Sequence, residues 1–214
     1  SFAWTDQAHP LIECHAALSD GLVSTACSRT KNLAAMVAHH IVQDRIIFPA
    51  AGYLEMARAA TASIESTPIM LLEVMFLLPL VLLEDALVEV ERQNDKFEIR
   101  CVTADSTNVH CTGALANQQQ AASLSVESVF LRCDESDEKE VGVLYDAFAC
   151  GGLQYGPAFR TLRRVWITPK HCAAKLWRRI DRQRTHVHPA DLDGVIQLSV
   201  AHKYLSDART ILPF

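Results

Sequence analysis

Apolar positions after Pro49 recur with helical spacing, whereas those further along the chain are typical of strands. Pro49 precedes a stretch of helical composition, and the spacing predicts a helix over residues 50–64. Segments rich in Val, Leu, Ile and Phe predict strands at 22–28, 45–48, 86–93, 96–104 and 108–116. Asn94-Asp95 marks a turn, so a hairpin is expected around it. The first 116 residues therefore predict an α+β unit in which a sheet wraps around one helix.

The most apolar stretch of the chain runs from Pro68 to Leu83. It is shorter than the ~20 residues that a membrane-spanning helix needs, and Glu73 and Pro79 interrupt it. Proline cannot donate to a central ladder, so the pattern favours two buried strands broken at Pro79. The N-terminal residues lack the layout of a signal peptide. We therefore expect a soluble, cytoplasmic protein.

The second half of the chain is set apart by a change in composition. Residues 117–134 are rich in Gln, Ser and acidic side chains, which favours a linker between an N-terminal unit at 1–116 and a C-terminal unit at 135–214. Beyond it the pattern predicts a helix ended by Gly151-Gly152, two strands and a long helix, at 141–152, 162–168, 171–179 and 188–207.

Proline opens both long predicted helices. Pro49-Ala50 begins the first, Pro189-Ala190 begins the last, and Asp191 is the expected N-cap of the latter. This shared arrangement predicts two copies of one strand–helix–sheet unit.

Charge and cysteine content exclude several classes of protein. The 20 Lys and Arg against 25 Asp and Glu give a net charge of −5, which leaves no basic footprint for nucleic acid. The 7 Cys are odd in number and form no CxxC, which favours reduced thiols over a disulfide framework. The sequence has no P-loop, GxGxxG or GxSxG. His186 and His188 lack an evident third ligand, so no metal site is expected.

His40 and Asp193 are the strongest acid–base candidates. The helix dipole favours the ionised form of Asp193, while its apolar neighbours favour the neutral form. A carboxyl group between these influences can donate a proton near neutral pH, and a neutral histidine is a natural base. Gln197 lies four residues after Asp193, on the same helical face. Because the chain has 9 His, spacing alone leaves a structural role for His40 open.

Four motifs along the chain favour a catalytic role for His40 over a structural one. They are HPLIE at 9–13, HIVQDRIIFP at 40–49, YGPAF at 155–159 and HPADLDGVIQ at 188–197. Together they resemble the HPLL start, the HxxxGxxxxP signature, the YGPxF motif and the HPxxLD…Q segment of dehydratase domains. Such domains occur in polyketide synthases and animal-type fatty acid synthases. The resemblance extends over residues 9–197.

The resemblance implies an α+β double hot dog, in which two curled antiparallel sheets each wrap a long helix. It implies a hydro-lyase that converts a 3-hydroxyacyl thioester on an acyl carrier protein into a 2,3-enoyl thioester. His40 would remove the proton next to the thioester carbonyl, Asp193 would protonate the departing hydroxyl, and Gln197 would orient Asp193. The other residues implied to bind or orient the substrate are Tyr155, Gly156, Pro157, Pro49 and Gly52, the last through a backbone N–H that polarises the thioester carbonyl.

The resemblance also implies which cofactors and partners to expect. No metal or redox cofactor is required, because the substrate arrives on the phosphopantetheine of the carrier protein. The expected partners are the acyl carrier protein, other synthase domains and a second copy of the chain in a homodimer, with neither nucleic acid nor membrane.

Two positions depart from the family pattern. Asp44 stands where the signature has Gly, and Asp is expected to tolerate a positive φ there. Arg160 stands where Gln is common and is expected to face solvent. The alternatives are isomerisation, product-template cyclisation, or a non-catalytic scaffold that docks a carrier protein. The second unit is also short for a hot dog, so we expect its C-terminal strands to be missing, truncated or reduced.

Overall fold

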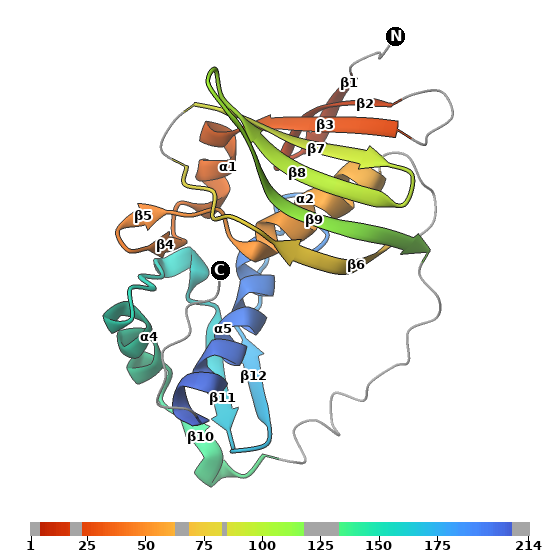
Figure 1. Cartoon of the computed structure of the whole chain (residues 1–214). Helices are drawn as coiled ribbons and strands as arrows, with labels where there is room; N and C mark the ends of the chain where they lie inside the picture. Colours follow the sequence, from red (N-terminus) through yellow and green to blue (C-terminus); the bar gives the residue numbers. More distant parts are fainter. Residues whose placement is uncertain (1–4, 18–22, 63–68, 83–84, 118–132, 207–214) are drawn as a thin grey trace.

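The computed structural model describes residues 5–17, 23–62, 69–82, 85–117 and 133–206. Figure 1 shows two parts: a large curved sheet around one helix, and a smaller part with two helices and a short sheet. Most of the predicted linker, residues 118–132, lies outside the described residues.

The large sheet has seven antiparallel strands in the order β1-β2-β3-β7-β8-β9-β6. The bounds are β1 (Thr5–His9), β2 (Ile12–Ala17), β3 (Val23–Arg29), β6 (Ile69–Phe76), β7 (Leu87–Gln93), β8 (Lys96–Val102) and β9 (Thr107–Asn117). The predicted hairpin is confirmed, since Gln93 pairs with Lys96 across the Asn94-Asp95 turn. The residue pattern did not predict β1 and β2, whose short segments carry too few alternating positions to indicate strands.

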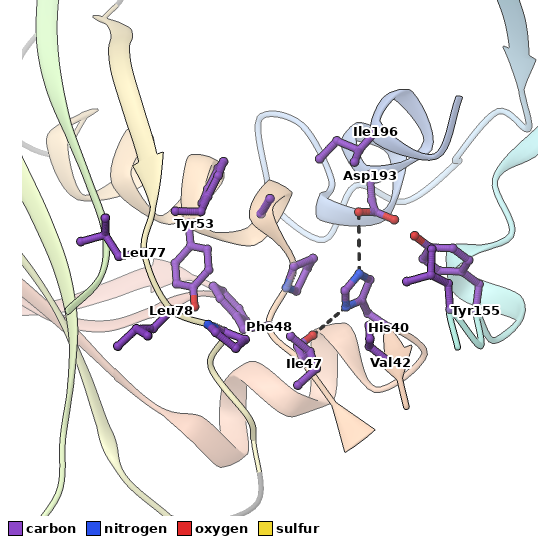
Figure 2. A pocket seen from close by; sticks show the side chains of 15 residues that line it. His40, Val42, Ile47, Phe48, Tyr53, Leu77, Leu78, Tyr155, Asp193 and Ile196 are labelled. Carbon is purple, nitrogen blue, oxygen red and sulfur yellow. Dashed lines mark hydrogen bonds and ion pairs between the residues drawn. The ribbon is translucent and has the colours of Figure 1, made fainter. Parts of the chain in front are cut away.

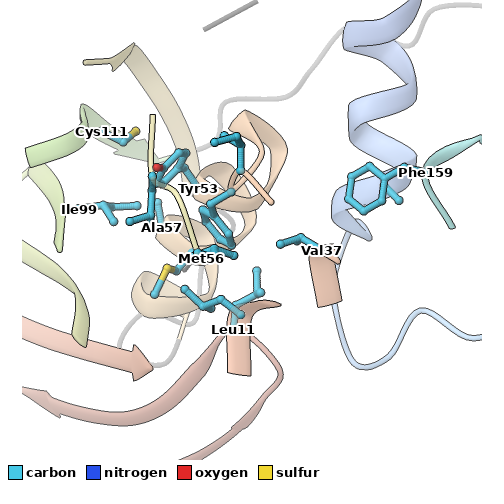
Figure 3. Close-up of a cluster of buried hydrophobic side chains, with 14 of the residues drawn as sticks. Leu11, Val37, Tyr53, Met56, Ala57, Ile99, Cys111 and Phe159 are labelled. Atoms are coloured by element: carbon cyan, nitrogen blue, oxygen red, sulfur yellow. The ribbon is translucent and has the colours of Figure 1, made fainter. Parts of the chain in front are cut away.

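The predicted first long helix is confirmed as α2 (Ala50–Ala62), which lies within the curve of the sheet. Met56 and Ala57 of this helix join Ile99 and Cys111 of the sheet in one buried cluster (Figure 3). Burying a side chain the size of Met or Ile contributes about 1.5–3 kcal/mol, so this face holds helix and sheet together.

The apolar run at 68–83 corrects the sequence prediction. Over its described residues, 69–82, it forms one strand, β6, at the edge of the sheet, and Phe76, Leu77 and Leu78 are exposed. After Pro79, Val81 makes only an isolated bridge with Ile47. Pro79 lies beyond the end of this strand. Residues 76–79 line the cavity described below, whereas Leu80 and Leu82 are buried in the core, so the run supplies both the cavity wall and the core.

A helix and a small hairpin follow β3. The helix is α1 (Thr30–Val37), and the hairpin consists of β4 (Ile41–Val42) and β5 (Arg45–Ile46). These two short strands pair with each other, with Ile41 opposite Ile46.

The smaller part contains a three-stranded sheet and two helices. The strands, in the order β10-β11-β12, are β10 (Glu138–Lys139), β11 (Leu162–Ile167) and β12 (Cys172–Leu176). The helices are α4 (Val141–Cys150), near the predicted bounds, and α5 (Pro189–Ser206). Asp191 is not the N-cap, because α5 already begins at Pro189; instead its Oδ1 accepts a hydrogen bond from Arg179 Nε at 2.9 Å.

One pair of cysteines departs from the expectation of reduced thiols. Cys14 on β2 and Cys27 on β3 lie directly opposite each other and form a disulfide. The sequence could not show this pairing, because it depends on the register of a strand that the pattern did not predict. Among the described helices, none is long and apolar enough to cross a membrane.

Candidate active site

A cavity of about 320 Å³ lies where the two parts of the molecule meet (Figure 2). Its wall is apolar over most of its area, and it includes one histidine and one carboxylic acid. The lining residues on the side of the large sheet and α2 are Val42, Ile47, Phe48, Pro49, Ala50, Tyr53, Phe76, Leu77, Leu78 and Pro79. The remaining wall consists of His40, Leu153, Tyr155, Asp193 and Ile196.

The β4–β5 hairpin positions His40. It brings Ile47 back beside His40, where the Ile47 N–H donates to the His40 carbonyl at 3.2 Å. The Nδ1 of His40 lies 2.7 Å from the Ile47 carbonyl oxygen. A carbonyl only accepts, so Nδ1 carries the hydrogen and Nε2 of the neutral ring presents a lone pair. The backbone therefore selects the tautomer that a general base at Nε2 requires.

The turn of this hairpin explains the Asp44 departure. Gln43 and Asp44 have φ values of 49° and 62°, so Asp44 does adopt the positive φ that aspartate was expected to tolerate. The Asp44 carboxylate accepts a hydrogen bond from Gln154 Nε2 at 2.7 Å, and Gln154 Oε1 accepts one from the Asp44 N–H at 2.8 Å. The carboxylate is therefore paired with the second part of the molecule.

Backbone pairing also joins the two parts next to His40. Three hydrogen bonds of 2.8 Å connect residues 39–43 with 152–156, and the last is donated by the Gly156 N–H to the His39 carbonyl. As a result the Tyr155 ring lies beside His40, with their centroids 5.7 Å apart. This pairing holds the base against the wall that the second part supplies.

Asp193 faces His40 from the first turns of α5 (Figure 2). Its Oδ1 lies 3.8 Å from His40 Nε2, and the residue is only 2% exposed. Burial raises the pKa of Asp193, while His40 and a hydrogen bond from Gln197 partly oppose that rise. The site therefore favours a carboxyl group that holds its proton longer than an exposed aspartate does.

Gln197 lies one turn beyond Asp193 and is fully buried. Its Nε2 donates to Asp193 Oδ2 and to the Phe159 carbonyl, both at 2.9 Å. Its Oε1 accepts a hydrogen bond from the Tyr145 hydroxyl at 3.0 Å. Sequence reasoning missed Tyr145, since a buried tyrosine on a predicted helix is typical of a core and nothing in its spacing connects it with Asp193.

The other residues singled out from the sequence divide into two groups. Tyr155 and Pro49 lie on the cavity wall, whereas Gly156 and Pro157 are outside the lining set. Gly156 instead permits close packing, because a Cβ there would come within 2.8 Å of the His39 ring.

Gly52 also has a packing role in the structure. Its N–H donates to the Pro49 carbonyl at 2.8 Å within the first turn of α2, so the expected polarising N–H is already engaged. A Cβ at this position would come within 2.7 Å of the Phe48 ring. Glycine therefore leaves room for the tip of the Phe48 ring against the start of the helix.

Glu55 is a second buried carboxylate that the sequence did not reveal, and it is only 2% exposed. It accepts hydrogen bonds from Arg58 at 2.8 and 3.0 Å and from the His186 N–H at 2.6 Å, and it lies 3.2 Å from His9 Nε2. Burial opposes its ionisation, yet these bonds lower the pKa of Glu55 to about 2. The carboxylate thus connects α2 with the segment that leads into α5.

Arg160 is exposed, as expected, but it is also anchored. Its Nε donates to the Tyr155 carbonyl at 2.8 Å, and its guanidinium lies 5.2 Å from the centre of the Tyr145 ring. Within the described ranges, no group of three or more His, Cys, Asp or Glu side chains is arranged to hold a metal.

Comparison with known families matches nearly the whole chain. A family model described as the polyketide synthase dehydratase domain matches residues 9–112, and one described as the polyketide synthase dehydratase N-terminal domain matches residues 121–214. The chain belongs to the polyketide synthase dehydratase family.

The curated relatives of this dehydratase domain are far longer proteins. It is 27% identical to polyketide synthase PksN of Bacillus subtilis over 83% of the chain, and 31% identical to ThaG of Burkholderia thailandensis over 75%. It is 29% identical to GfsA of Streptomyces halstedii over 96% of the chain. The chain spans only 3–4% of the length of these three relatives.

Solved dehydratase domains share its fold. A domain of a trans-AT polyketide synthase from Brevibacillus brevis superposes with a TM-score of 0.80 at 22% identity, over 96% of this chain and 77% of that one. The dehydratase of the terminal rifamycin synthase module gives a TM-score of 0.78 at 24% identity, over 94% of this chain and 79% of that one. The fold of the dehydratase domain is therefore the double hot dog, as expected.

Proposed function

We propose that this domain removes water from a 3-hydroxyacyl thioester carried on an acyl carrier protein and forms a 2,3-enoyl thioester. The observation that carries the proposal is the 3.8 Å separation of His40 Nε2 and Asp193 Oδ1, two buried side chains on the wall of a largely apolar cavity. A base with a free lone pair and an acid with a raised pKa face the same space. These are the two groups that an elimination of water requires.

The proposed reaction moves two protons. His40 Nε2 takes the proton from C2, the electron pair of that C–H bond forms the C2=C3 double bond, and the C3–O bond breaks. Asp193 gives its proton to the departing hydroxyl, which leaves as water. His40 is then cationic and Asp193 anionic, and transfer of the proton from Nε2 to the carboxylate restores both. Each positioned proton transfer can contribute ~10²–10⁴-fold to the rate.

The surroundings suit this division of roles. The hydrogen bond from Nδ1 to the Ile47 carbonyl fixes the tautomer of His40 and stabilises the imidazolium as it forms. The apolar wall excludes competing water and favours the protonated acid. Among solved neighbours, a His-to-Phe and an Asp-to-Asn variant of the CurK dehydratase are each described as inactive, which supports the same pair here.

The proposal also covers the setting of the domain. The substrate would arrive on the phosphopantetheine arm of an acyl carrier protein, and two proton transfers require no further cofactor. Other synthase domains, a second copy of the domain in a homodimer, and a cytoplasmic location complete the proposal.

Turnover of 3-hydroxyacyl thioesters by the wild type, His40→Ala and Asp193→Asn tests the function. We expect the wild type to release the enoyl product and each variant to lose at least about 10²-fold in rate. Mass spectrometry of the products separates dehydration from isomerisation or cyclisation, which lose no water. Equal turnover by all three proteins would overturn the assignment.

A further inference from the structure

Tyr53 on α2 has a buried hydroxyl group with no partner. The residue is only 3% exposed and lines the cavity. Within the part of the chain that the structure describes, its hydroxyl oxygen is shielded from solvent and makes no hydrogen bond. The mechanism proposed above does not use this group.

The surroundings of this hydroxyl are apolar. The Phe48 ring lies edge-on at 4.8 Å between centroids, and the Phe76 ring lies at 6.0 Å. Figure 2 shows Tyr53 beside Leu77 and Leu78, on the side of the cavity opposite Asp193. Burial raises the pKa of Tyr53, and the nearby Cys111 and Cys101 thiols add to the rise. The Leu80 backbone opposes the rise, but it does not meet the geometry of a hydrogen bond to the Tyr53 hydroxyl. The hydroxyl therefore stays neutral and keeps a proton to donate.

Comparison with Tyr145 shows how unusual this is. Tyr145 is 4% exposed, nearly as buried as Tyr53, yet its hydroxyl donates to Gln197 at 3.0 Å and accepts from the Leu162 N–H at 3.2 Å. Buried polar groups normally have such partners, because leaving one unpaired costs stability. A phenylalanine would fill the Tyr53 position without that cost, so the hydroxyl calls for a partner that the chain itself does not supply.

We infer that the Tyr53 hydroxyl donates a hydrogen bond to an acceptor oxygen of the bound substrate, which makes Tyr53 a specificity-determining residue. The inference rests on the proposed function, since it takes the cavity as the binding site of an acyl thioester. The 3-hydroxyl and the thioester carbonyl belong to the reacting centre, which the proposed function places at His40 and Asp193, on the far side of the cavity from Tyr53 (Figure 2). Two further parts of such a substrate carry acceptor oxygens: an oxygenated acyl chain beyond C3, and the amide carbonyls of the pantetheine arm. A substrate with an acceptor oxygen next to Tyr53 would bind more tightly than one with only hydrocarbon there.

Stability is the first test, and it needs no ligand. Tyr53→Phe should leave Tm unchanged or raise it, because it deletes an unpaired group. Tyr145→Phe is the matched control and should lower Tm, because its hydroxyl has two partners. A fall in Tm for Tyr53→Phe as large as that for the control would show an internal partner and would overturn the inference.

Binding of unreactive substrate analogues is the second test. Acyl-pantetheine amides without the 3-hydroxyl are compared by calorimetry as matched sets: a plain chain, chains with one hydroxyl or keto oxygen at successive carbons beyond C3, and the same chains on a truncated thiol handle. Tyr53→Phe should raise Kd about tenfold for the ligand whose oxygen reaches the wall, and change the others less than about twofold.

The pattern of affected ligands identifies the source of the oxygen. If the loss of affinity in Tyr53→Phe depends on where the acyl chain carries its oxygen, the acceptor is on the acyl chain. If the loss of affinity disappears when the handle is truncated, the acceptor is on pantetheine. Both results support the inference. An equal Kd for the two proteins with every ligand, as expected if only water meets the hydroxyl, overturns it.

Turnover separates this inference from the proposed function. A wild type that eliminates water, with a Tyr53→Phe variant that binds every ligand equally well, refutes the inference alone. A wild type that binds these ligands without eliminating water refutes the proposed function, while the binding data still decide the role of Tyr53.

Discussion

The Tyr145 hydroxyl donates its proton to the Gln197 side-chain oxygen, 3.0 Å away, and thereby decides which end of that amide faces Asp193. With its oxygen occupied, Gln197 presents its NH₂ group to Asp193 Oδ2 at 2.9 Å. A residue of α4 thus orients the proposed acid on α5 without lying on the cavity wall itself. Tyr145 is accordingly a positioning residue.

Tyr145→Phe should reduce both catalysis and stability. The Gln197 oxygen and the Leu162 N–H would lose their partner, which costs roughly 1–3 kcal/mol in the free energy of unfolding. We expect kcat to fall about 10–100-fold as the amide loses its orientation, with KM nearly unchanged, because Tyr145 does not line the cavity. Steady-state kinetics on the purified variant measure this split. A raised KM at unchanged kcat would contradict the positioning role.

Asp193→Asn should inactivate the domain and stabilise it at the same time. Burial raises the folded-state pKa of Asp193 above its unfolded value, so the residue costs stability progressively as the pH rises above the unfolded pKa, and the full cost is reached above the folded one. Asparagine removes that cost and can still accept the hydrogen bond from Gln197. We expect Tm at neutral pH to rise by about 2–4 °C, the shift that ~1 kcal/mol gives in a chain of this size. A lower Tm at pH 7 would show that the ionised carboxylate stabilises the fold.

Glu55→Gln should destabilise the protein at neutral pH and make its free energy of unfolding less dependent on pH in the acid range. The pKa of Glu55 is lowered from 4.5 to about 2, so the stability it contributes is complete above pH 4.5 and is lost as the pH falls toward about 2. We expect the free energy of unfolding to fall by about 2–3 kcal/mol at pH 7. Urea titrations of both proteins between pH 7 and pH 3 measure the difference. Parallel curves over this range would rule out a special role for this carboxylate.

Asp44 and Gln154 should prove energetically coupled. Their two hydrogen bonds join the β4–β5 turn to the second part of the molecule. Because both groups are solvent-accessible, we expect a coupling of only about 0.5–1 kcal/mol in a double-mutant cycle of Asp44→Ala and Gln154→Ala. Additive effects of the two substitutions on the free energy of unfolding would show that the pair is incidental.

How far the sequence predicts this molecule depends on the range of the interactions involved. The helix after Pro49 and the hairpin at Asn94-Asp95 follow from local pattern and turn chemistry, and the structure has both. The motifs indicated His40 and Asp193 as a pair, but their 3.8 Å separation depends on how residues 39–43 pair with 152–156, which no local pattern encodes.

What the sequence missed consists of contacts between distant segments. Tyr145 and Glu55 act through partners 52 and 131 residues away, Gln197 and the His186 N–H respectively. The apolar run at 68–83 predicted two core strands, but residues 76–79 line the cavity, and a cavity wall and a core have the same composition. Gly52 was likewise expected to polarise the thioester carbonyl through its N–H, whereas that N–H bonds to the Pro49 carbonyl and the glycine makes room for Phe48.

The rate of dehydration should fall as the pH rises, because the active form requires a protonated Asp193. Its raised pKa places this alkaline limb of kcat/KM above the ordinary range of an aspartate. The hydrogen bond from Gln197 favours the carboxylate and so lowers the pKa of Asp193. Replacing the amide by a thioether of similar size, in Gln197→Met, should therefore move the alkaline limb to higher pH while kcat falls. Leu198→Met, one position further along the helix and only partly buried, is the control and should leave the limb in place. A limb that stays fixed in Gln197→Met, or moves to lower pH, would assign the titration to a group other than Asp193.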